Sequence, residues 1–392
     1  MSISFLTFNV LSSHYTYFNL ARCPPNFNHV SELETIEVRN FRHKQILHYI
    51  LAVNPDIGCL QEVEGILYQR IVNCLSNGDE EAIKMGIPIN SYDQERKWEI
   101  TYTYKKNIEN ANTGLLIFYR KNKFSINKQW IQIIQKYKEN TTILEDNTTK
   151  NENISFGIDY GIYKYHKNPP EFVDKKDKLF RNPNKWSQII CIKGRTNSHK
   201  NIIITNIHLE GDPNKSIIRT NQFQNVINYY EYLDQNLEGN NYSIISGDWN
   251  DEDPIYPYSG LNHHARKANT KNKLSFLPYF KNFVDVSQFP KIYRGMATSY
   301  QINTFDFEEA KKENKKGKQL DYKKFYSYND DPWKIIDHIV ISENIYCEMV
   351  NLYPNNPSGV MGLSTPYVDT ENMILGNWPS DHAALTMNIE LI

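Results

Sequence analysis

Six polar motifs, each at or just past the end of a run of apolar residues, hold the groups in this sequence that could do chemistry. They are Phe8-Asn9-Val10, Gln61-Glu62-Val63, Ile207-His208-Leu209, Gly247-Asp248-Trp249-Asn250, Ile336-Asp337-His338 and Ser380-Asp381-His382. A rigid strand can present a side chain at its end to a cleft. Burying a carboxylate there without a partner would be costly. The motifs therefore imply a metal ion or a strong hydrogen-bond network.

The donor atoms of these motifs favour one class of metal and one class of reaction. Carboxylate and amide oxygens are ligands for magnesium, manganese or calcium, whereas zinc prefers cysteine and histidine. Magnesium suits phosphate chemistry because it keeps several waters and shares the oxygens of the substrate. Histidines that can pair with aspartates add proton transfer or charge stabilisation. Together the motifs predict hydrolysis of a phosphate ester with Mg²⁺, for which Mn²⁺ can substitute.

Each motif alone also has an ordinary structural explanation. Gln61-Glu62-Val63 could begin a helix, Gly247-Asp248-Trp249-Asn250 could form a turn, and Ser380-Asp381-His382 could cap a helix. Their conjunction at the edges of successive strands is much harder to obtain by chance.

The elements that must position these motifs alternate between strands and helices. Short runs rich in β-branched and aromatic residues predict strands over 3–10, 56–60, 113–119, 189–192, 202–207, 242–246, 335–341 and 383–391. Apolar residues at helical spacing predict helices over 40–53 and 216–237. This alternation indicates a layered α/β fold.

Two polar segments interrupt the pattern, at about 127–185 and 307–331. The first is rich in Asn, Lys and Thr, and the second contains a long run of charged residues. Neither could bury enough apolar surface to form a core of its own. We therefore expect one catalytic domain over 1–392 with two insertions.

Charge and cysteine content bound the surroundings of the protein. The 44 basic and 45 acidic side chains give a net charge of −1, so an anionic substrate must be held locally rather than by a global field. The five cysteines are scattered and odd in number, which fits a reducing compartment. Neither a signal peptide nor a membrane span is recognisable, so we expect a cytoplasmic or nuclear location.

The six motifs, in this order, resemble the signature of the endonuclease/exonuclease/phosphatase superfamily. Three stretches resemble most the branch that contains deadenylases, nocturnin and Angel proteins. They are Asn9-Val10-Leu11-Ser12-Ser13-His14-Tyr15, the run from Thr113 through Lys121, and His208-Leu209-Glu210-Gly211-Asp212-Pro213. The resemblance implies a four-layered α/β sandwich, with two packed mixed sheets flanked by helices.

The resemblance also implies a role for each polar residue of the motifs. The metal ligands would be Glu62, Asn9 and Asp381. Asp248 and Asn250 would act in catalysis by positioning the attacking water. His208 and His382 would stabilise charge on phosphorus, and Asp337 would orient His382. The resemblance places Asn9 and Pro213 at the substrate, with Pro213 against an adenine base. Trp333, chosen as an aromatic residue rather than from the resemblance, could stack on a base or lie in the core.

The leading functional expectation is a metal-dependent hydrolase that cleaves a phosphodiester. Its substrate would be RNA, attacked as by a deadenylase-like 3′ exonuclease, or a small adenylated nucleotide. The first alternative is a tyrosyl-DNA phosphodiesterase-like or phosphoinositide phosphatase activity, because His208-Leu209-Glu210 also resembles tyrosyl-DNA phosphodiesterases. The second is a catalytically inactive nucleotide-binding module, against which the presence of all the site residues argues.

Overall fold

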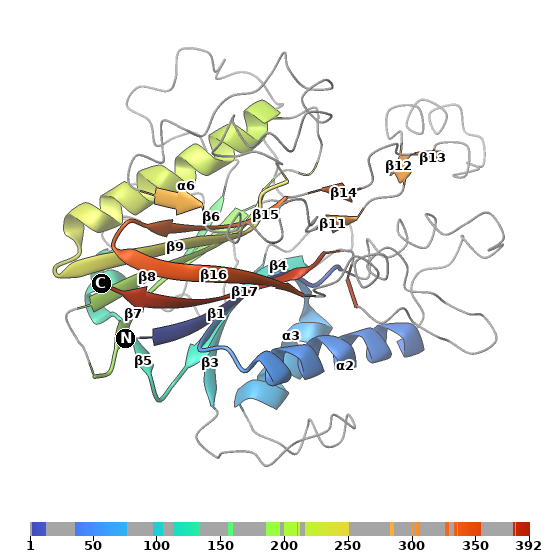
Figure 1. Cartoon of the computed structure of the whole chain (residues 1–392), viewed down its shortest axis with the longest axis horizontal. Helices are drawn as coiled ribbons and strands as arrows, with labels where there is room; N and C mark the ends of the chain where they lie inside the picture. Colours follow the sequence, from blue (N-terminus) through green and yellow to red (C-terminus); the bar gives the residue numbers. More distant parts are fainter. Residues whose placement is uncertain are drawn as a thin grey trace.

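Two mixed β-sheets packed face to face form the centre of the protein in the computed structural model (Figure 1). The structure describes residues 2–12, 36–76, 97–104, 113–133, 156–159, 186–196, 200–209, 211, 216–250, 283–285, 299–300, 303–305, 326–328, 333–334, 336–353, 379–380 and 382–392.

The first sheet has six strands and the second has seven. In spatial order the first sheet contains β16 (Ile345–Tyr353), β17 (Ala384–Leu391), β1 (Ser2–Asn9), β2 (Ile57–Glu64), β4 (Thr113–Arg120) and β3 (Trp98–Tyr104). The second contains β10 (Phe283–Asp285), β15 (Asp337–Ser342), β9 (Asn240–Asp248), β8 (Lys200–His208), β7 (Trp186–Gly194) and β5 (Phe124–Ile126), with β6 (Phe156–Asp159) also paired to β7. Two small ribbons join β11 (Ser299–Tyr300) to β14 (Trp333–Lys334) and β12 (Asn303–Phe305) to β13 (Tyr326–Tyr328).

Each sheet contains one parallel pair of strands with a helix between them in the chain. Helix α2 (Ile36–Val53) lies between β1 and β2, and helix α6 (Ser216–Asn236) lies between β8 and β9. Parallel neighbours need such a crossover, because a tight turn can join only antiparallel strands. The carboxyl ends of each pair are level, since Asn9 is in register with Gln61 and His208 with Asp248.

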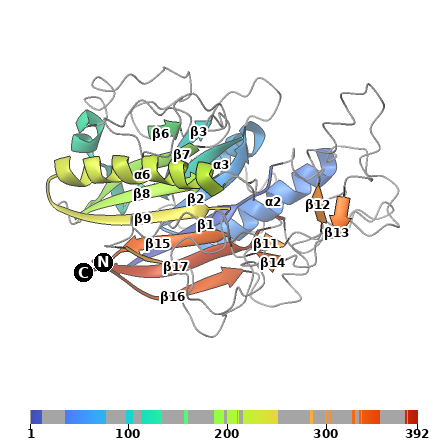
Figure 2. The same ribbon diagram turned by 90° about the horizontal axis from the view of Figure 1, so that it is seen from above.

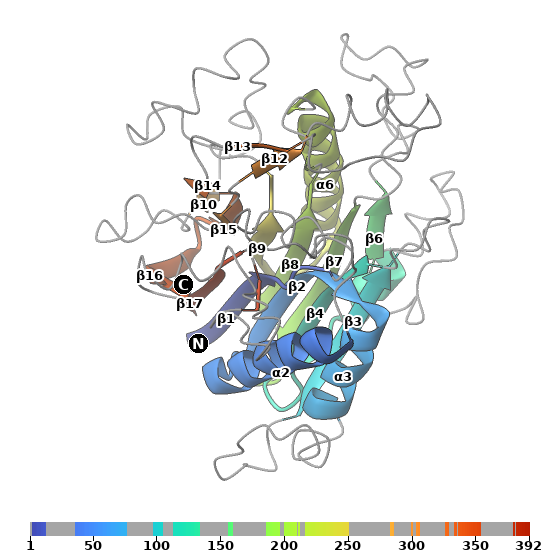
Figure 3. The ribbon, with the colours of Figure 1, turned by 90° about the vertical axis from the view of Figure 1, so that its right-hand side faces the viewer.

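The helices cover the outer faces of the two sheets. Helix α6 packs on the second sheet, whereas α2 and α3 (Gly65–Ser76) pack on the first (Figures 1 and 2). Turned by a quarter, the molecule again shows α6 on one side of the strands and α2 with α3 on the other (Figure 3). The four-layered sandwich expected from the sequence is confirmed.

The core follows the alternation of side chains along each strand. In β1, Ile3 and Phe5 belong to the apolar cluster that includes the second sheet, whereas Leu6 and Phe8 belong to the cluster beneath α2 and α3. Fully burying a side chain of this size stabilises the fold by about 1.5–3 kcal/mol. Because side chains alternate with a period of two, Asn9 lies on the face of Phe5 and points between the sheets.

All eight predicted strands and both predicted helices are present. Helix α2 begins at Ile36 rather than at residue 40, and β2 continues through Glu64. Helix α3 and strands β3 and β16 were not predicted. Within the first proposed insertion, β6 pairs with β7 and the Trp130 side chain is fully buried. The single-domain organisation stays a prediction.

None of the helices in the described part of the chain is long and apolar enough to span a membrane.

Acid is expected to destabilise the fold through His43, a buried histidine of α2. Burial, reinforced by the charges of Arg42, Arg70 and Arg39, lowers the pKa of His43 from 6.5 to about 2. Its Nδ1 lies 2.8 Å from Arg70 Nη1 and accepts the hydrogen bond, because a guanidinium only donates. Below pH 6.5 this histidine is protonated in the unfolded chain but stays neutral in the folded protein. The free energy of unfolding therefore falls by about 1.4 kcal/mol per pH unit until the pH reaches the pKa of His43 in the folded state.

Urea unfolding at pH 7 and pH 5 checks this expectation. We expect His43→Gln, which can still accept from Arg70, to lose about 2 kcal/mol less than the wild type between these two pH values. His48→Gln, at an exposed position of the same helix, serves as the control and should keep the wild-type pH dependence. An unchanged pH dependence in His43→Gln would contradict the assignment.

Candidate active site

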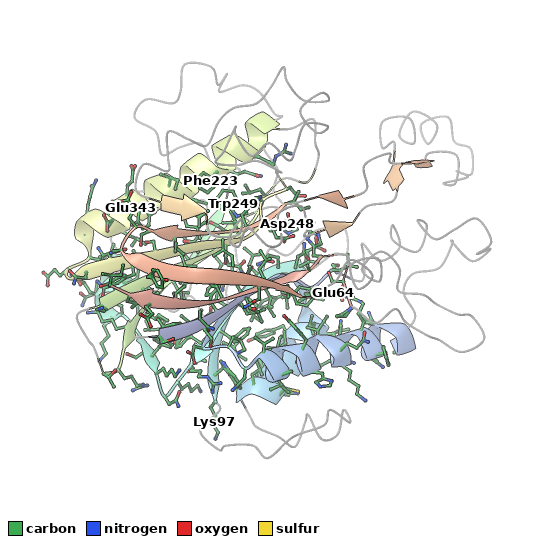
Figure 4. The ribbon with its side chains drawn as sticks, in the orientation of Figure 1. Glu64, Lys97, Phe223, Asp248, Trp249 and Glu343 are labelled. Atoms are coloured by element: carbon green, nitrogen blue, oxygen red, sulfur yellow. The ribbon has the colours of Figure 1, made fainter. Side chains whose placement is uncertain are left out.

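The polar residues predicted from the sequence gather at one end of the two sheets. This end holds the carboxyl ends of both parallel pairs, and the antiparallel strand β15 begins there with Asp337 opposite Asp248. Strand β17 runs antiparallel to β1, with Leu385 opposite Thr7, so the segment preceding it returns to Asn9. In Figure 4, Asp248 and Glu64 lie towards this end of the strands, whereas Glu343 lies at the opposite end.

Asn9 occupies the centre of the site, where its amide joins four groups. Its Nδ2 lies 3.3 Å from Glu62 Oε1, 3.0 Å from Asp248 Oδ2 and 3.4 Å from His382 Nε2. Its Oδ1 accepts from the backbone N–H of Leu11 at 3.1 Å. The amide thus turns its donor towards the two carboxylates, which holds together two groups that would otherwise repel one another.

Glu62 reaches the site through a β-bulge. Between Leu60 and Val63 the register of β2 with β4 shifts, so that Gln61 and Glu62 oppose a single residue. Glu62 itself has a left-handed φ of 60°. In an unbroken strand Glu62 would share the face of Leu60 and point towards the helices. The bulge turns it inward instead, where Oε2 accepts from the backbone N–H of Ser12 at 2.9 Å.

Asp248 is presented by a backbone shape that requires glycine before it. Gly247 has a φ of +134°, and a Cβ there would meet the carbonyl oxygen of Ile207 at 2.1 Å. After Asp248 the chain turns sharply, with Asn250 at a φ of 50°. The backbone N–H of Asn250 donates to Asp248 Oδ1 at 2.9 Å, and its Nδ2 donates to the carbonyl of Leu209 at 3.0 Å. Asp248 Oδ2 therefore remains directed at the centre of the site.

Two histidines approach Asp248 from different segments of the chain. His208, at the end of β8, places Nε2 3.6 Å from both Glu62 Oε1 and Asp248 Oδ2. His382 places Nε2 3.8 Å from Asp248 Oδ2, while its Nδ1 lies 2.8 Å from Asp337 Oδ2. A carboxylate can only accept, so Nδ1 carries the proton and Nε2 faces the site. Asp337 thereby fixes both the tautomer and the orientation of the ring.

The donor set fits a divalent cation of the magnesium type. Glu62, His208 and Asp248 offer ligand atoms within 4.8 Å of one another, and Asp248, Asp337 and His382 form a second such group. The carboxylates are enclosed, at 9% exposed for Glu62 and 2% each for Asp248 and Asp337. A divalent cation would compensate this buried negative charge, and the carboxylate oxygens suit Mg²⁺ or Mn²⁺.

The structure brings together most of the residues predicted for the site. The side chains that converge are those of Asn9, Glu62, His208, Asp248, Asp337 and His382, and Asn250 contacts Asp248 through its backbone N–H. Asp381 and Pro213 lie outside the described residues. Trp333 lies in β14, where the structure describes the backbone pairing with β11 but not the side chain.

Two serines at the site were not singled out by the sequence analysis. Ser12 donates its backbone N–H to Glu62, and its hydroxyl lies 2.9 Å from Glu64 Oε1. Ser380 donates its hydroxyl to the carbonyl of Asn9 at 2.7 Å and accepts from the backbone N–H of His382 at 3.1 Å. Both serines belong to motifs named above, but contacts with the backbone cannot be predicted from the type of a residue.

A model of the endonuclease/exonuclease/phosphatase family matches residues 6–382 of this chain. No curated protein sequence matches it.

Several solved structures have a similar fold. One is ANGEL2, a 2′,3′-cyclic phosphatase, solved in complex with adenosine-2′,3′-vanadate. Its sequence is 13% identical, the match covers 100% of this chain and 96% of that chain, and the TM-score is 0.55. A family protein from Bacteroides thetaiotaomicron has 11% identity, coverages of 99% and 97%, and a TM-score of 0.52. Truncated TDP2 from Caenorhabditis elegans has 13% identity, coverages of 99% and 97%, and a TM-score of 0.50. At these identities the likeness shows a shared fold.

Proposed function

Because this chain belongs to the endonuclease/exonuclease/phosphatase family, we propose that it is a divalent-metal-dependent phosphodiesterase. Membership makes it a phosphoesterase, and the metal requirement and the diester substrate are the finer proposal. The observation that carries the proposal is the convergence of Glu62, Asp248 and the Asp337–His382 pair on one enclosed point. These residues come from β2, β9, β15 and the residues just before β17.

Glu62 would hold the metal ion, and we propose Asp381 as a further ligand. When bound, Mg²⁺ supplies positive charge that polarises a phosphoryl oxygen and stabilises negative charge in the transition state. In the structure the oxygen of Asn9 accepts from Leu11, whereas its nitrogen faces Glu62 and Asp248. We therefore propose that Asn9 acts here mainly by ordering the carboxylates, rather than as the oxygen ligand expected from the resemblance.

The other residues would handle the attacking water and the charge on phosphorus. Asp248 Oδ2 lies where it can orient a water and accept its proton, and the backbone of Asn250 holds the other oxygen of the same carboxylate. His208 and His382 present Nε2 to the same point and would donate to the phosphoryl oxygens as charge accumulates there. Asp337 stabilises the protonated form of His382.

The substrate class that we propose is RNA or a small adenylated nucleotide. Support comes from the resemblance of the segments around Asn9, Thr113 and His208 to the deadenylase, nocturnin and Angel branch. ANGEL2, which shares the fold, was solved with an adenosine-2′,3′-vanadate ligand. Pro213 and Trp333 are the proposed base contacts. The scattered, odd number of cysteines supports the proposed cytoplasmic or nuclear location.

A panel of labelled substrates tests the substrate class. It contains an RNA with a 3′ adenosine tail, the same RNA with a uridine tail, a small adenylated nucleotide, a 5′-tyrosyl DNA and a soluble phosphoinositide. Preference for the adenosine tail or the adenylated nucleotide is the expected result. Preference for the tyrosyl DNA or the phosphoinositide would replace the proposed substrate while keeping the reaction type, and binding of a nucleotide without turnover would identify an inactive module.

Removal of divalent cations is expected to reduce hydrolysis to background. The described side chains of the site then include several buried carboxylates without the double positive charge that a divalent ion supplies. Turnover of the RNA substrate and of bis(p-nitrophenyl) phosphate should return with Mg²⁺ or Mn²⁺. EDTA that has been saturated with Mg²⁺ beforehand serves as the control for effects of the chelator itself. Undiminished turnover after exhaustive chelation would rule out the metal mechanism.

A further inference from the structure

Arg42 is a buried arginine whose guanidinium holds two segments of the active site. It lies in α2, is 1% exposed, and donates through Nη1 to three backbone carbonyls. The distances are 2.7 Å to Val10, 2.6 Å to Leu11 and 3.3 Å to Pro379. We propose that Arg42 is a positioning residue of the phosphodiesterase site, and we refer to these three hydrogen bonds as the Arg42 clasp.

The position of Arg42 on its helix is one where an apolar residue would be expected. Ile46 and Ile50 follow it at intervals of four residues, and both are fully buried against the first sheet. Arginine is almost never fully buried unless its donors are satisfied. A hydrogen bond from a charged donor is also stronger than one between neutral groups. The burial of Arg42 is therefore explained by the carbonyls that it binds.

The first arm of the clasp holds the segment that follows β1. Leu11 has a left-handed φ of 56°, a conformation that a branched side chain does not favour. In that conformation its N–H donates to Asn9 Oδ1, and the next N–H, of Ser12, donates to Glu62 Oε2. By binding the carbonyls of Val10 and Leu11, Arg42 stabilises the turn on which the orientations of Asn9 and Glu62 depend.

The second arm holds the segment that carries His382. Arg42 binds the carbonyl of Pro379, and the adjacent Ser380 links the carbonyl of Asn9 to the backbone N–H of His382. Pro379 is 337 residues from Arg42 in the chain, so the contact joins parts that sequence proximity cannot hold together. A single guanidinium thus ties the carboxylate side of the site to its histidine side.

The inference rests on the proposed function, and its test therefore includes measurements that do not depend on enzyme activity. Arg42→Met keeps the aliphatic stem and removes the donors. We expect this substitution to lower Mn²⁺ affinity, measured by calorimetry, by about 10- to 100-fold, because the loss of groups that orient metal ligands has effects of this size. The kcat for bis(p-nitrophenyl) phosphate should fall by about the same factor, with little change in KM. Hydrogen exchange should be faster in the segments that contain Ser12 and His382, measured by mass spectrometry without metal.

Arg120→Met is the matched control, because Arg120 is a buried arginine far from the site. It contacts Asp56 at 3.1 Å and the carbonyl of Asn54 at 3.1 Å, beside the first residues of β2. This variant should lower the unfolding temperature but keep wild-type Mn²⁺ affinity and wild-type exchange near Ser12 and His382. If Arg42→Met differs from the wild type only in unfolding temperature, as Arg120→Met is expected to, the proposal is overturned.

Arg42→Lys covers the case in which Arg42→Met does not fold. Lysine keeps the charge but is too short to reach all three carbonyls. The Mn²⁺ affinity of Arg42→Lys, and its hydrogen-exchange rates near Ser12 and His382, should therefore lie between the wild-type values and those expected when the Arg42 clasp is lost. Wild-type values for both in Arg42→Lys would overturn the proposal. If the wild-type protein hydrolyses no phosphodiester, the proposed function fails, and the exchange measurements still decide whether the clasp orders the two segments.

Discussion

Glu62→Gln is expected to lose measurable metal affinity and to slow phosphodiester hydrolysis by about a thousandfold, the scale associated with removing one major electrostatic contribution in a transition state. The substitution keeps the size and shape of the side chain. Glutamine can still accept from the backbone N–H of Ser12, which now lies 2.9 Å from Oε2. The fold should therefore survive, and the loss can be attributed to the missing charge rather than to a displaced bulge.

Calorimetry with Mn²⁺, together with steady-state kinetics across a range of Mg²⁺ concentrations, measures both effects. Glu99→Gln makes the same change at a half-exposed glutamate of β3 whose carboxylate pairs with Lys121 at 3.3 Å, remote from the site. It should leave metal affinity and rate as in the wild type. Unchanged Mn²⁺ affinity in Glu62→Gln would mean that Glu62 does not bind the ion, and Asp248 would then have to be considered as its principal ligand.

Asp337→Asn and His382→Ala are each expected to lower the rate by about two to three orders of magnitude. The double variant should be scarcely slower than the slower single variant. The structure supplies the reason, because His382 Nδ1 lies 2.8 Å from Asp337 Oδ2 in a buried pair. An aspartate whose role is to orient an imidazole has nothing to contribute once the imidazole is gone.

A double-mutant cycle at saturating Mg²⁺, with the fold of each variant checked by circular dichroism, distinguishes this arrangement from two independent roles. Independent roles would make the two rate losses multiply. The substitution of Asp337 by asparagine is the informative one, because asparagine can donate to Nδ1 and so favour the opposite tautomer. Strict multiplicativity would show that Asp337 does not act through His382.

The sequence predicted the interior strands of each sheet and left out strands at the edges. The order of the first sheet places β16 and β3 at its two ends, and these are the longest strands that the sequence pattern did not predict. An edge strand has a neighbour on one side only and tolerates more polar residues, so its apolar run is interrupted. Helix α3 did leave a signal, since Leu67, Ile71, Cys74 and Leu75 have helical spacing.

The residue types of the site could be predicted, but their orientations could not. Asn9 follows the alternation of β1 and lies where a strand pattern puts it. The orientation of Glu62 depends on a bulge between Leu60 and Val63, and no glycine or proline in that stretch predicts it. The partners of Glu62 and His382 include the backbone of Ser12 and the hydroxyl of Ser380, which depend on tertiary contacts between distant segments. Motif order therefore identifies the chemical groups, whereas the fold decides what each group faces.

The pairing of β1 with β17 also determines when the enzyme can first exist during its synthesis. Ser2 is in register with Glu390, and the two ends of the chain lie side by side (Figure 1). The histidine whose Nε2 lies 3.4 Å from Asn9 is made 373 residues after it. Until β17 emerges, β1 and β16 each lack their shared neighbour and the Asp337–His382 pair cannot form. A nascent chain therefore stays without a complete site until translation has delivered His382 and β17.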